Sequence, residues 1–183
     1  MNLVNITPIM TSDNTPVPYL CYASSVWEGY PAYKAFDGNN TGTSYWHVSS
    51  GNSGYLVFDF GSPTNVAAFN LYNVIYAGSY DPYNIKVYGS HDGKTFELIQ
   101  EFINNNSVLT KDDIFYFDKQ VTYKAYKFDM ITRGSYLAIQ ELRMFEDTDQ
   151  TIKMSNIIKN KVLKTILNNS LIQKYTIPYV KKE

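Results

Sequence analysis

The sequence predicts an all-β sandwich followed by a C-terminal amphipathic helix, and three observations support this fold class. The chain of 183 residues contains 17 Tyr and 10 Phe, residue types that pack well on the pleated, half-buried surface of a sheet. Between Tyr19 and Glu146, short apolar runs alternate with Gly, Pro, Asn and Asp, which is typical of a sandwich or barrel. After Asp149, apolar residues recur at helical spacing instead.

The expected strands follow one another at short intervals along the chain. Gly61-Ser62-Pro63 ends the first long apolar run, because these residue types favour turns. Asp92-Gly93 separates two further apolar runs, and an Asp-Gly pair in that position is a strong hairpin signal. We therefore expect strands at residues 54–60, 66–76, 84–89, 95–102, 114–117, 123–131 and 137–145.

Residues 151–174 are expected to form one amphipathic helix, with Pro178 beyond its end. A helical apolar stripe must be buried, either against the sandwich of the same chain or against another chain, and both alternatives stay open. We expect a sandwich at residues 1–147 and a helical attachment tail at 148–183. The stripe consists of Ile157, Ile158, Val162, Leu163, Ile166, Leu167, Leu171 and Ile172.

The charges divide at the same boundary. Residues 1–147 carry 9 basic and 15 acidic side chains, whereas residues 148–183 carry 7 basic and 2 acidic ones, giving -6 and +5 within a total of -1. This balance gives no indication of nucleic-acid binding. No apolar run approaches the roughly 20 residues that span a bilayer, and Cys21, the only cysteine, allows no internal disulfide.

Several short segments together carry a resemblance to a known family. They are residues 22–25 (YASS), 30–40 (YPAYKAFDGNN), Trp46, 54–61 (GYLVFDFG), 88–96 (YGSHDGKTF) and 139–145 (IQELRMF). In this order and spacing they resemble the discoidin, or coagulation factor V/VIII type C, domain superfamily across about residues 15–146. The closest likeness is to bacterial carbohydrate-binding modules and phage tail proteins. The resemblance implies a jelly-roll-like, galactose-binding-like antiparallel sandwich with binding loops at one end.

An oxygen-rich loop between Ala35 and Trp46 is a candidate calcium site, because hard cations take carboxylate, amide, hydroxyl and carbonyl oxygens. In similar domains a structural calcium takes ligands from this loop and a Glu from the last strand. The stretch between Asp37 and Trp46 is longer than the common family pattern, so Ser44 is an alternative to Thr43. A metal-free turn with Asp37 capping backbone amides is the other interpretation. The resemblance implies Asp37, Asn40, Thr43 and Glu141 as calcium ligands, with carbonyls near Lys34 and Gln140.

The same resemblance implies a sugar site, because sugar-binding members use His, Arg, Asn and aromatic side chains in the loops at one end. Trp46 is expected in the core. Trp27 lies in an apparent loop, where its ring either stacks on a sugar or covers the end of the sandwich. The candidate sugar contacts are Trp27, Tyr30, His47, Tyr76, Tyr80, Asp81, Arg133 and Tyr136.

We expect a non-catalytic carbohydrate-binding module and no enzymatic activity. His47 and His91 are the only histidines, and the chain shows no nucleophile-elbow, P-loop or zinc motif. Asp59 and Asp92 are expected to be structural. The alternative function is a purely structural assembly protein that uses the sandwich as a scaffold for protein–protein interaction.

The expected setting is a phage virion appendage, a tail or capsid structure that contacts glycans on the host surface. The N-terminus lacks a basic segment followed by an apolar run, so no signal peptide is expected, and no accompanying catalytic domain is expected either. The partners would be other virion proteins, or copies of the chain itself, held through the C-terminal helix. The alternative location is the exterior or surface of a bacterium.

Overall fold

The computed structural model describes residues 2–39, 41–73 and 78–149. The chain divides into two compact units, one at Leu3–Glu146 and one that joins Met1–Asn2 to Asp147–Glu183. The expected helix at 151–174 and two predicted site residues, Asn40 and Tyr76, lie outside the described residues.

The described part of the chain is almost entirely β-structure, which confirms the all-β prediction. A single short 3-10 helix, η1 (Ala32–Ala35), interrupts it. The strands are β1 (Leu3–Asn5), β2 (Leu20–Ala23), β3 (Trp46–His47), β4 (Ser53–Tyr72), β5 (Pro82–Ser90), β6 (Glu97–Ile103), β7 (Phe115–Thr132), β8 (Ala138–Ile139) and β9 (Glu141–Asp147).

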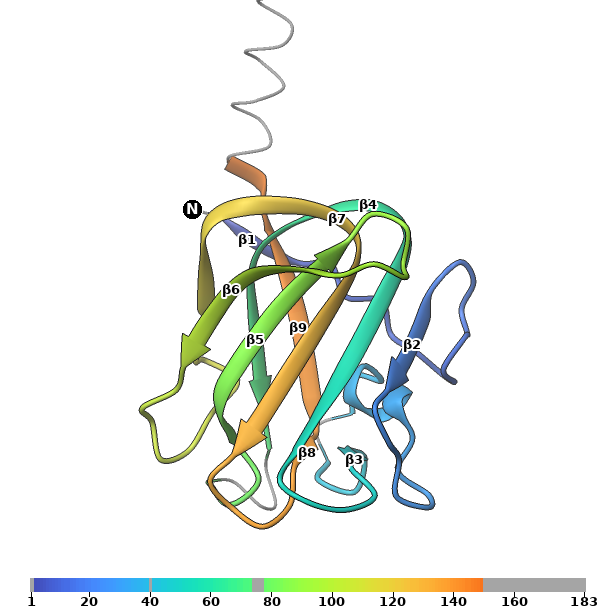
Figure 1. Cartoon of the computed structure of the whole chain (residues 1–183). Helices are drawn as coiled ribbons and strands as arrows, with labels where there is room; N and C mark the ends of the chain where they lie inside the picture. Colours follow the sequence, from blue (N-terminus) through green and yellow to red (C-terminus); the bar gives the residue numbers. More distant parts are fainter. Residues whose placement is uncertain (1, 40, 74–77, 150–183) are drawn as a thin grey trace, which may run out of the picture. The chain divides into compact units, whose positions relative to one another are not determined.

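The strands form one large folded sheet and one small sheet. The large sheet has the order β1-β9-β4-β7-β5-β6, with β2 added to β4, and the small sheet consists of β3 and β8. The first half of β4 pairs with β2 and with the second half of β7. The second half of β4 pairs with β9. The β4–β7 pair therefore runs through both layers of the sandwich and bends over at one end (Figure 1).

This continuous pair differs from the sequence-based expectation of separate strands at 54–60 and 66–76, and at 114–117 and 123–131. Gly61 does break the regular pairing, since its φ is 78° and the register with β7 shifts between Asp59 and Thr64. Pairing with β7 resumes at Thr64, however, so the break is a bend within β4. The predicted strand at 137–145 is likewise divided into β8 and β9, whereas the hairpin at Asp92-Gly93 is present between β5 and β6.

The inner faces of the two layers enclose an aromatic core. Trp46, Phe58, Phe69 and Phe128 are all 0% exposed, and Phe69 contacts Phe128 with ring centroids 5.1 Å apart. Full burial of such side chains contributes about 1.5–3 kcal/mol each. The core position of Trp46 confirms the sequence-based expectation and anchors β3 against the sandwich.

Two predicted structural acids have structural contacts. The Asp59 carboxylate accepts a hydrogen bond from the Gly61 amide at 2.7 Å and pairs with the Lys124 ammonium at 3.0 Å. Asp92 accepts bonds from the amides of Lys94 and Thr95, and these bonds hold the pKa of its carboxyl well below the usual range. Both acids therefore stabilise turns.

The bend of the β4–β7 pair is fixed by the phenol of Tyr126, which is 0% exposed. Its hydroxyl lies 2.7 Å from the Thr64 carbonyl and 3.1 Å from the Val121 carbonyl, and it accepts a bond from the Tyr123 amide at 3.0 Å. Tyr126 thus satisfies backbone groups on both strands at the point where their own pairing is irregular.

We predict that Tyr126→Phe destabilises the sandwich by about 1–3 kcal/mol, because it leaves buried backbone groups without a partner. Urea unfolding monitored by far-UV circular dichroism measures this change. Tyr116→Phe is the matched control, since Tyr116 is 48% exposed and should change stability by less than about 0.5 kcal/mol. Equal stability of the two variants would contradict the assigned role of Tyr126.

Candidate functional site

Six ring-bearing side chains meet beside β3. The small β3–β8 sheet lies at the end of the sandwich opposite the bends of β4 and β7 (Figure 1). The six side chains come from four chain segments, namely residues 27–30, 45–47, the loop ending at Tyr80, and the loop before β8. We refer to this group as the aromatic cluster, and its members are Trp27, Tyr30, Tyr45, His47, Tyr80 and Tyr136.

His47 is the centre of the aromatic cluster. Its ring centroid lies 4.9 Å from that of Trp27, 5.6 Å from that of Tyr80 and 5.7 Å from that of Tyr136. Tyr30 and Tyr45 stack on each other at 4.5 Å, and each lies 6.4 Å from the imidazole. Three rings therefore contact the imidazole in edge or tilted geometry. The stacked pair of phenol rings lies slightly farther from it.

The imidazole of His47 is oriented by the backbone. His47 is 6% exposed, and its Nδ1 lies 2.5 Å from the carbonyl oxygen of Val48. A carbonyl oxygen only accepts, so Nδ1 carries the proton, and in the neutral ring Nε2 is an acceptor. Such an acceptor can receive the hydrogen of a ligand hydroxyl.

Backbone pairing holds the loops of the cluster together. His47 pairs with Ala138 across the β3–β8 sheet. The Trp27 amide donates to the His47 carbonyl at 2.9 Å, and the Tyr30 amide donates to the Trp27 carbonyl at 3.0 Å. These bonds fix residues 27–30 beside β3.

The loops of Tyr80 and Tyr136 are in close contact through a glycine. A Cβ atom at Gly134 would lie 1.9 Å from the carbonyl oxygen of Ser79, so only glycine allows this approach. The Thr132 hydroxyl donates to the same carbonyl at 3.3 Å. The positions of the Tyr80 and Tyr136 rings therefore depend on each other.

The rings surround a shallow hollow of about 240 Å³, lined by Trp27, Tyr30, Tyr45, His47 and Tyr80. This volume is slightly below the range of about 300–1,000 Å³ that is usual for drug-sized ligands. Trp27 is 47% exposed and Tyr136 is 41% exposed. Trp27 thus presents nearly half of its surface to solvent while its ring contacts His47 and Tyr136.

The structure brings together five of the predicted sugar contacts, which are Trp27, Tyr30, His47, Tyr80 and Tyr136. It adds Tyr45, which the sequence analysis missed. The available signal was its position directly before the buried Trp46, since neighbouring residues of a strand point to opposite faces.

Two predicted contacts have other partners. Asp81 is 5% exposed, and its carboxylate accepts hydrogen bonds from Asn73, from the Gly78 amide and from the Leu109 amide. The buried carboxylate connects the loops of Gly78 and Leu109, and Asp81 does not line the hollow.

Arg133 is exposed but is directed away from the cluster. Its guanidinium lies over the Tyr83 ring at 4.9 Å and donates to the Asn104 carbonyl at 3.2 Å. Among the described residues, those that line the hollow therefore include no arginine, lysine or carboxylate.

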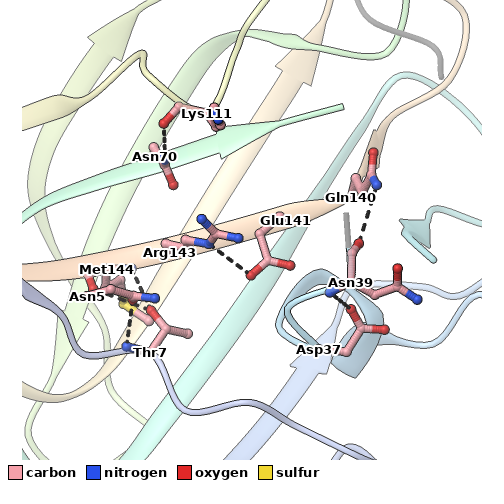
Figure 2. Close-up of polar contacts among 10 residues, drawn as sticks. All are labelled: Asn5, Thr7, Asp37, Asn39, Asn70, Lys111, Gln140, Glu141, Arg143 and Met144. Carbon is pink, nitrogen blue, oxygen red and sulfur yellow. Dashed lines mark hydrogen bonds and ion pairs between the residues drawn. The ribbon is translucent and has the colours of Figure 1, made fainter. Parts of the chain in front are cut away.

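The predicted calcium loop, residues 37–44, is tied together by its own side chains. Asp37 accepts a hydrogen bond from the Asn39 amide at 2.8 Å through Oδ1 (Figure 2). Its Oδ2 accepts a second hydrogen bond from the Ser44 hydroxyl. Thr43 is exposed, and its hydroxyl lies 3.4 Å from that of Thr41. The geometry thus favours Ser44, the alternative, over Thr43 as the hydroxyl beside Asp37.

Glu141 brings a second carboxylate to this loop from the start of β9. It is 3% exposed, and its Oε1 pairs with Nε of Arg143 at 3.2 Å (Figure 2). Among the described residues, no donor forms a hydrogen bond with Oε2. The pKa of Glu141 is raised to about 7, because burial, with a smaller contribution from the charge of Asp37, outweighs the lowering by Arg143 and the Gly38 amide.

These features fit a hard cation. A buried carboxylate oxygen without a donor, beside a second carboxylate, is costly, and the ion pair of Arg143 with the other oxygen of Glu141 offsets only part of this cost. Among residues 2–39, 41–73 and 78–149, no three His, Cys, Asp or Glu side chains are grouped so that they could hold a metal ion. A cation at Asp37 and Glu141 would therefore draw its other ligands from hydroxyl, amide and carbonyl oxygens, which suits calcium.

The fold is thus an antiparallel sandwich with aromatic side chains gathered in the loops at one end. Residues 21–142 match the F5/8 type C domain family, and the chain belongs to this family. The resemblance stated from the sequence is thus confirmed. No curated protein matches the chain.

Solved structures with the same fold include carbohydrate-binding modules of family 32. The module of NanJ from C. perfringens, in complex with galactose, has a TM-score of 0.59 and 20% identity, covering 70% of this chain and 93% of that one. A module of GH89 from Clostridium perfringens, in complex with GalNAc-β-1,3-galactose, has a TM-score of 0.60 and 17% identity, covering 70% and 95%. The module of AlyQ, in complex with 4,5-unsaturated mannuronic acid, has a TM-score of 0.55 and 17% identity, covering 69% and 94%. At these identities the likeness shows the fold.

Proposed function

We propose that the protein is a non-catalytic carbohydrate-binding module and that the aromatic cluster is its sugar site. The observation that carries the proposal is the hollow in which aromatic rings surround the imidazole of His47. Aromatic faces remove water from the C–H face of a sugar ring, while polar tips contact its hydroxyls. Structural neighbours that bind galactose, a GalNAc disaccharide or a mannuronic acid derivative support this reading.

The lining also suggests how the sugar is held. The stacked pair Tyr30 and Tyr45 provides one platform, and the exposed face of Trp27 provides another. Nε2 of His47 accepts a hydrogen bond from one hydroxyl. Because the hollow is shallow, affinity per site is expected to be low, and several copies on one surface would supply avidity.

We predict that Trp27→Ala and Tyr45→Ala each weaken glycan binding by about three- to tenfold, since a ring contact contributes about 0.5–1.5 kcal/mol beyond its buried area. Glycan-array screening identifies the sugar, and calorimetric titration with galactose or the best array hit measures the change. Arg133→Ala is the matched control and should retain binding. Loss of binding in Arg133→Ala, with both aromatic variants unaffected, would place the site elsewhere.

We further propose that calcium binds at Asp37 and Glu141 and has a structural role. The residues that would hold it are these two carboxylates, the Ser44 hydroxyl, the oxygens of Asn40 or Thr43, and carbonyls near Lys34 and Gln140. Bound calcium would supply a partner for the buried Oε2 of Glu141, in addition to the Arg143 guanidinium on Oε1. A cation bound only by the native state raises stability by mass action.

We predict opposite pH dependences with and without calcium. In chelator, the folded-state pKa of Glu141 of about 7 exceeds its ordinary value of 4.5, so the folded state holds a proton that the unfolded state has lost. Stability should therefore fall by at most about 3 kcal/mol as pH rises from 5 to 8. Calcium requires the ionised carboxylate, so its stabilisation should be larger at pH 8 than at pH 5.

Thermal unfolding in excess calcium and in chelator, at both pH values, checks this prediction. Glu141→Gln should abolish the calcium effect and the contribution of Glu141 to the pH dependence. Asp112→Asn, which removes an exposed carboxylate, should preserve both. An identical melting temperature with calcium and with chelator at pH 8 would refute the cation site.

The setting of the module is a separate proposal. We propose a phage virion appendage, with residues 148–183 as the element that attaches the sandwich to other virion proteins or to copies of itself. The +5 charge of these residues beside the -6 of residues 1–147, together with the aliphatic stripe at 157–172, supports this role. An exposed stripe of that size would cost several kcal/mol at about 25 cal/mol per Å². No helix in the described part of the chain has the length and apolarity needed to cross a bilayer.

We predict that truncation after Asp147 leaves a soluble sandwich of nearly full stability that retains glycan binding and loses self-association or assembly. Sedimentation velocity and urea unfolding of the two chains measure these properties. Loss of folding on truncation, with oligomeric state unchanged, would make residues 148–183 part of the core of the sandwich.

A further inference from the structure

A chain of buried hydrogen bonds connects the calcium loop to the loop that carries Tyr80. We call this side of the aromatic cluster the Tyr80 wall, and the side formed by Tyr45 and His47 the near wall. The Gln140 side-chain amide donates to the Asn39 carbonyl at 3.3 Å (Figure 2). The backbone amide of Gln140 donates to Asn73 Oδ1 at 2.9 Å, and Asn73 Nδ2 donates to Asp81 Oδ1 at 2.8 Å. Gln140, Asn73 and Asp81 are 2%, 7% and 5% exposed, so water competes little for these bonds.

Asp81 ends this chain by closing two loops. Its Oδ2 accepts from the Gly78 amide and from the Leu109 amide, each at 2.8 Å. Tyr80 precedes Asp81 directly, and a Cβ atom at Gly78 would lie 2.7 Å from the Ser107 carbonyl oxygen. The loop that carries Tyr80 is therefore fixed by hydrogen bonds to the Asp81 carboxylate and by close contact with the loop of Ser107.

Asn73 also contacts the β3–β8 strand pair, which carries His47. Its Nδ2 also donates to the Ala138 carbonyl at 2.8 Å, and Ala138 pairs with His47. One amide group thus sets the spacing between the Tyr80 loop and the strand pair that carries His47. Buried polar networks of this kind hold a specific geometry when all members are satisfied.

We propose that Asp81 is a positioning residue of the sugar site, and that Asn73 and Gln140 couple the Tyr80 wall to cation binding at Glu141 and the loop of Asn39. This inference rests on the proposed function. A cation that orders Glu141 and the calcium loop also orders Gln140, which lies between them. Asn73 transmits this order to Asp81, and the Tyr80 wall is then held in the geometry that accepts a sugar before the sugar arrives.

A second, covalent route leads from the calcium loop to the near wall, because Ser44 is followed by Tyr45, Trp46 and His47 in the chain. Trp46 and His47 should therefore still respond to calcium when the Gln140–Asn73–Asp81 chain is broken. Only the Tyr80 wall requires the Gln140–Asn73–Asp81 chain, so the two walls can be tested separately.

Nuclear magnetic resonance of the full chain, titrated with calcium alone, tests the coupling without any sugar. The reporters of the Tyr80 wall are the backbone amides of Gly78 and Leu109, both bonded to Asp81. The Trp46 indole, which donates to the Ser25 carbonyl at 3.0 Å, reports the near wall. Calcium should shift all three reporters and slow hydrogen exchange at Gly78 and Leu109. The Gly93 amide, in the β5–β6 turn, is the control and should not move.

Variants locate the route. Asn73→Leu removes the shared amide but keeps the bonds of Asp81 to Gly78 and Leu109, so calcium should still shift Trp46 and should no longer shift the other two reporters. Gln140→Met removes only the contact with Asn39 and should weaken the response, which covers the case in which Asn73→Leu does not fold. By reciprocity, saturating galactose or the best array hit should raise calcium affinity of the wild type roughly tenfold, by the same factor as calcium raises sugar affinity.

The outcomes separate the proposals. The coupling is overturned if calcium shifts Trp46 but leaves Gly78 and Leu109 unchanged in the wild type, or if Asn73→Leu keeps the full response. If calcium shifts no reporter and leaves the melting temperature unchanged, the cation site and the coupling both fail. Failure of every sugar to bind, with the calcium response present, removes the proposed function and leaves the transmission to the Tyr80 wall established.

Discussion

The structure depends on one long antiparallel pairing, that of β4 with β7. The two strands are shared by both layers, so the layers are joined by backbone pairing on either side of the bend as well as by packing of side chains. The pair can continue only if it bends, and Gly61 supplies the backbone conformation while the Tyr126 hydroxyl supplies the missing hydrogen-bond partners. With this pair in place, β2, β5 and β9 each have an edge on which to align.

The site follows from the strand ends that this pairing sets. β4 ends at Tyr72 beside the start of β9, so Asn73 reaches Gln140, and Glu141 meets the loop of Asp37. β7 ends at Thr132 opposite the start of β5, so the loops of Tyr136 and Tyr80 touch. The loop at residues 37–44 and the aromatic cluster are thus neighbours because the same few strand ends carry them.

The sequence predicted the all-β class, the β5–β6 hairpin and the family, because these depend on local turn residues and on motifs in order. It could not show that Gly61-Ser62-Pro63 bends one strand, since that depends on pairing with Thr122 and Tyr123 far along the chain. Loop positions of Trp27, His47, Tyr80 and Tyr136 were predictable through the resemblance. The directions in which the Arg133 and Asp81 side chains point were not predictable. They depend on contacts with Tyr83, Asn104 and Leu109, which come from other parts of the chain.

The direction of β9 has a mechanical consequence. It starts at Glu141, near the aromatic cluster, and runs to the opposite end, where the chain leaves the Leu3–Glu146 unit (Figure 1). Tension between a ligand held at the cluster and the chain beyond Glu146 would pull β9 along its own axis against β4. The five residue pairs from Ala68–Phe145 to Tyr72–Glu141 would then share the load in shear and would have to open together. If the strand were peeled from one end, the pairs would instead open one after another.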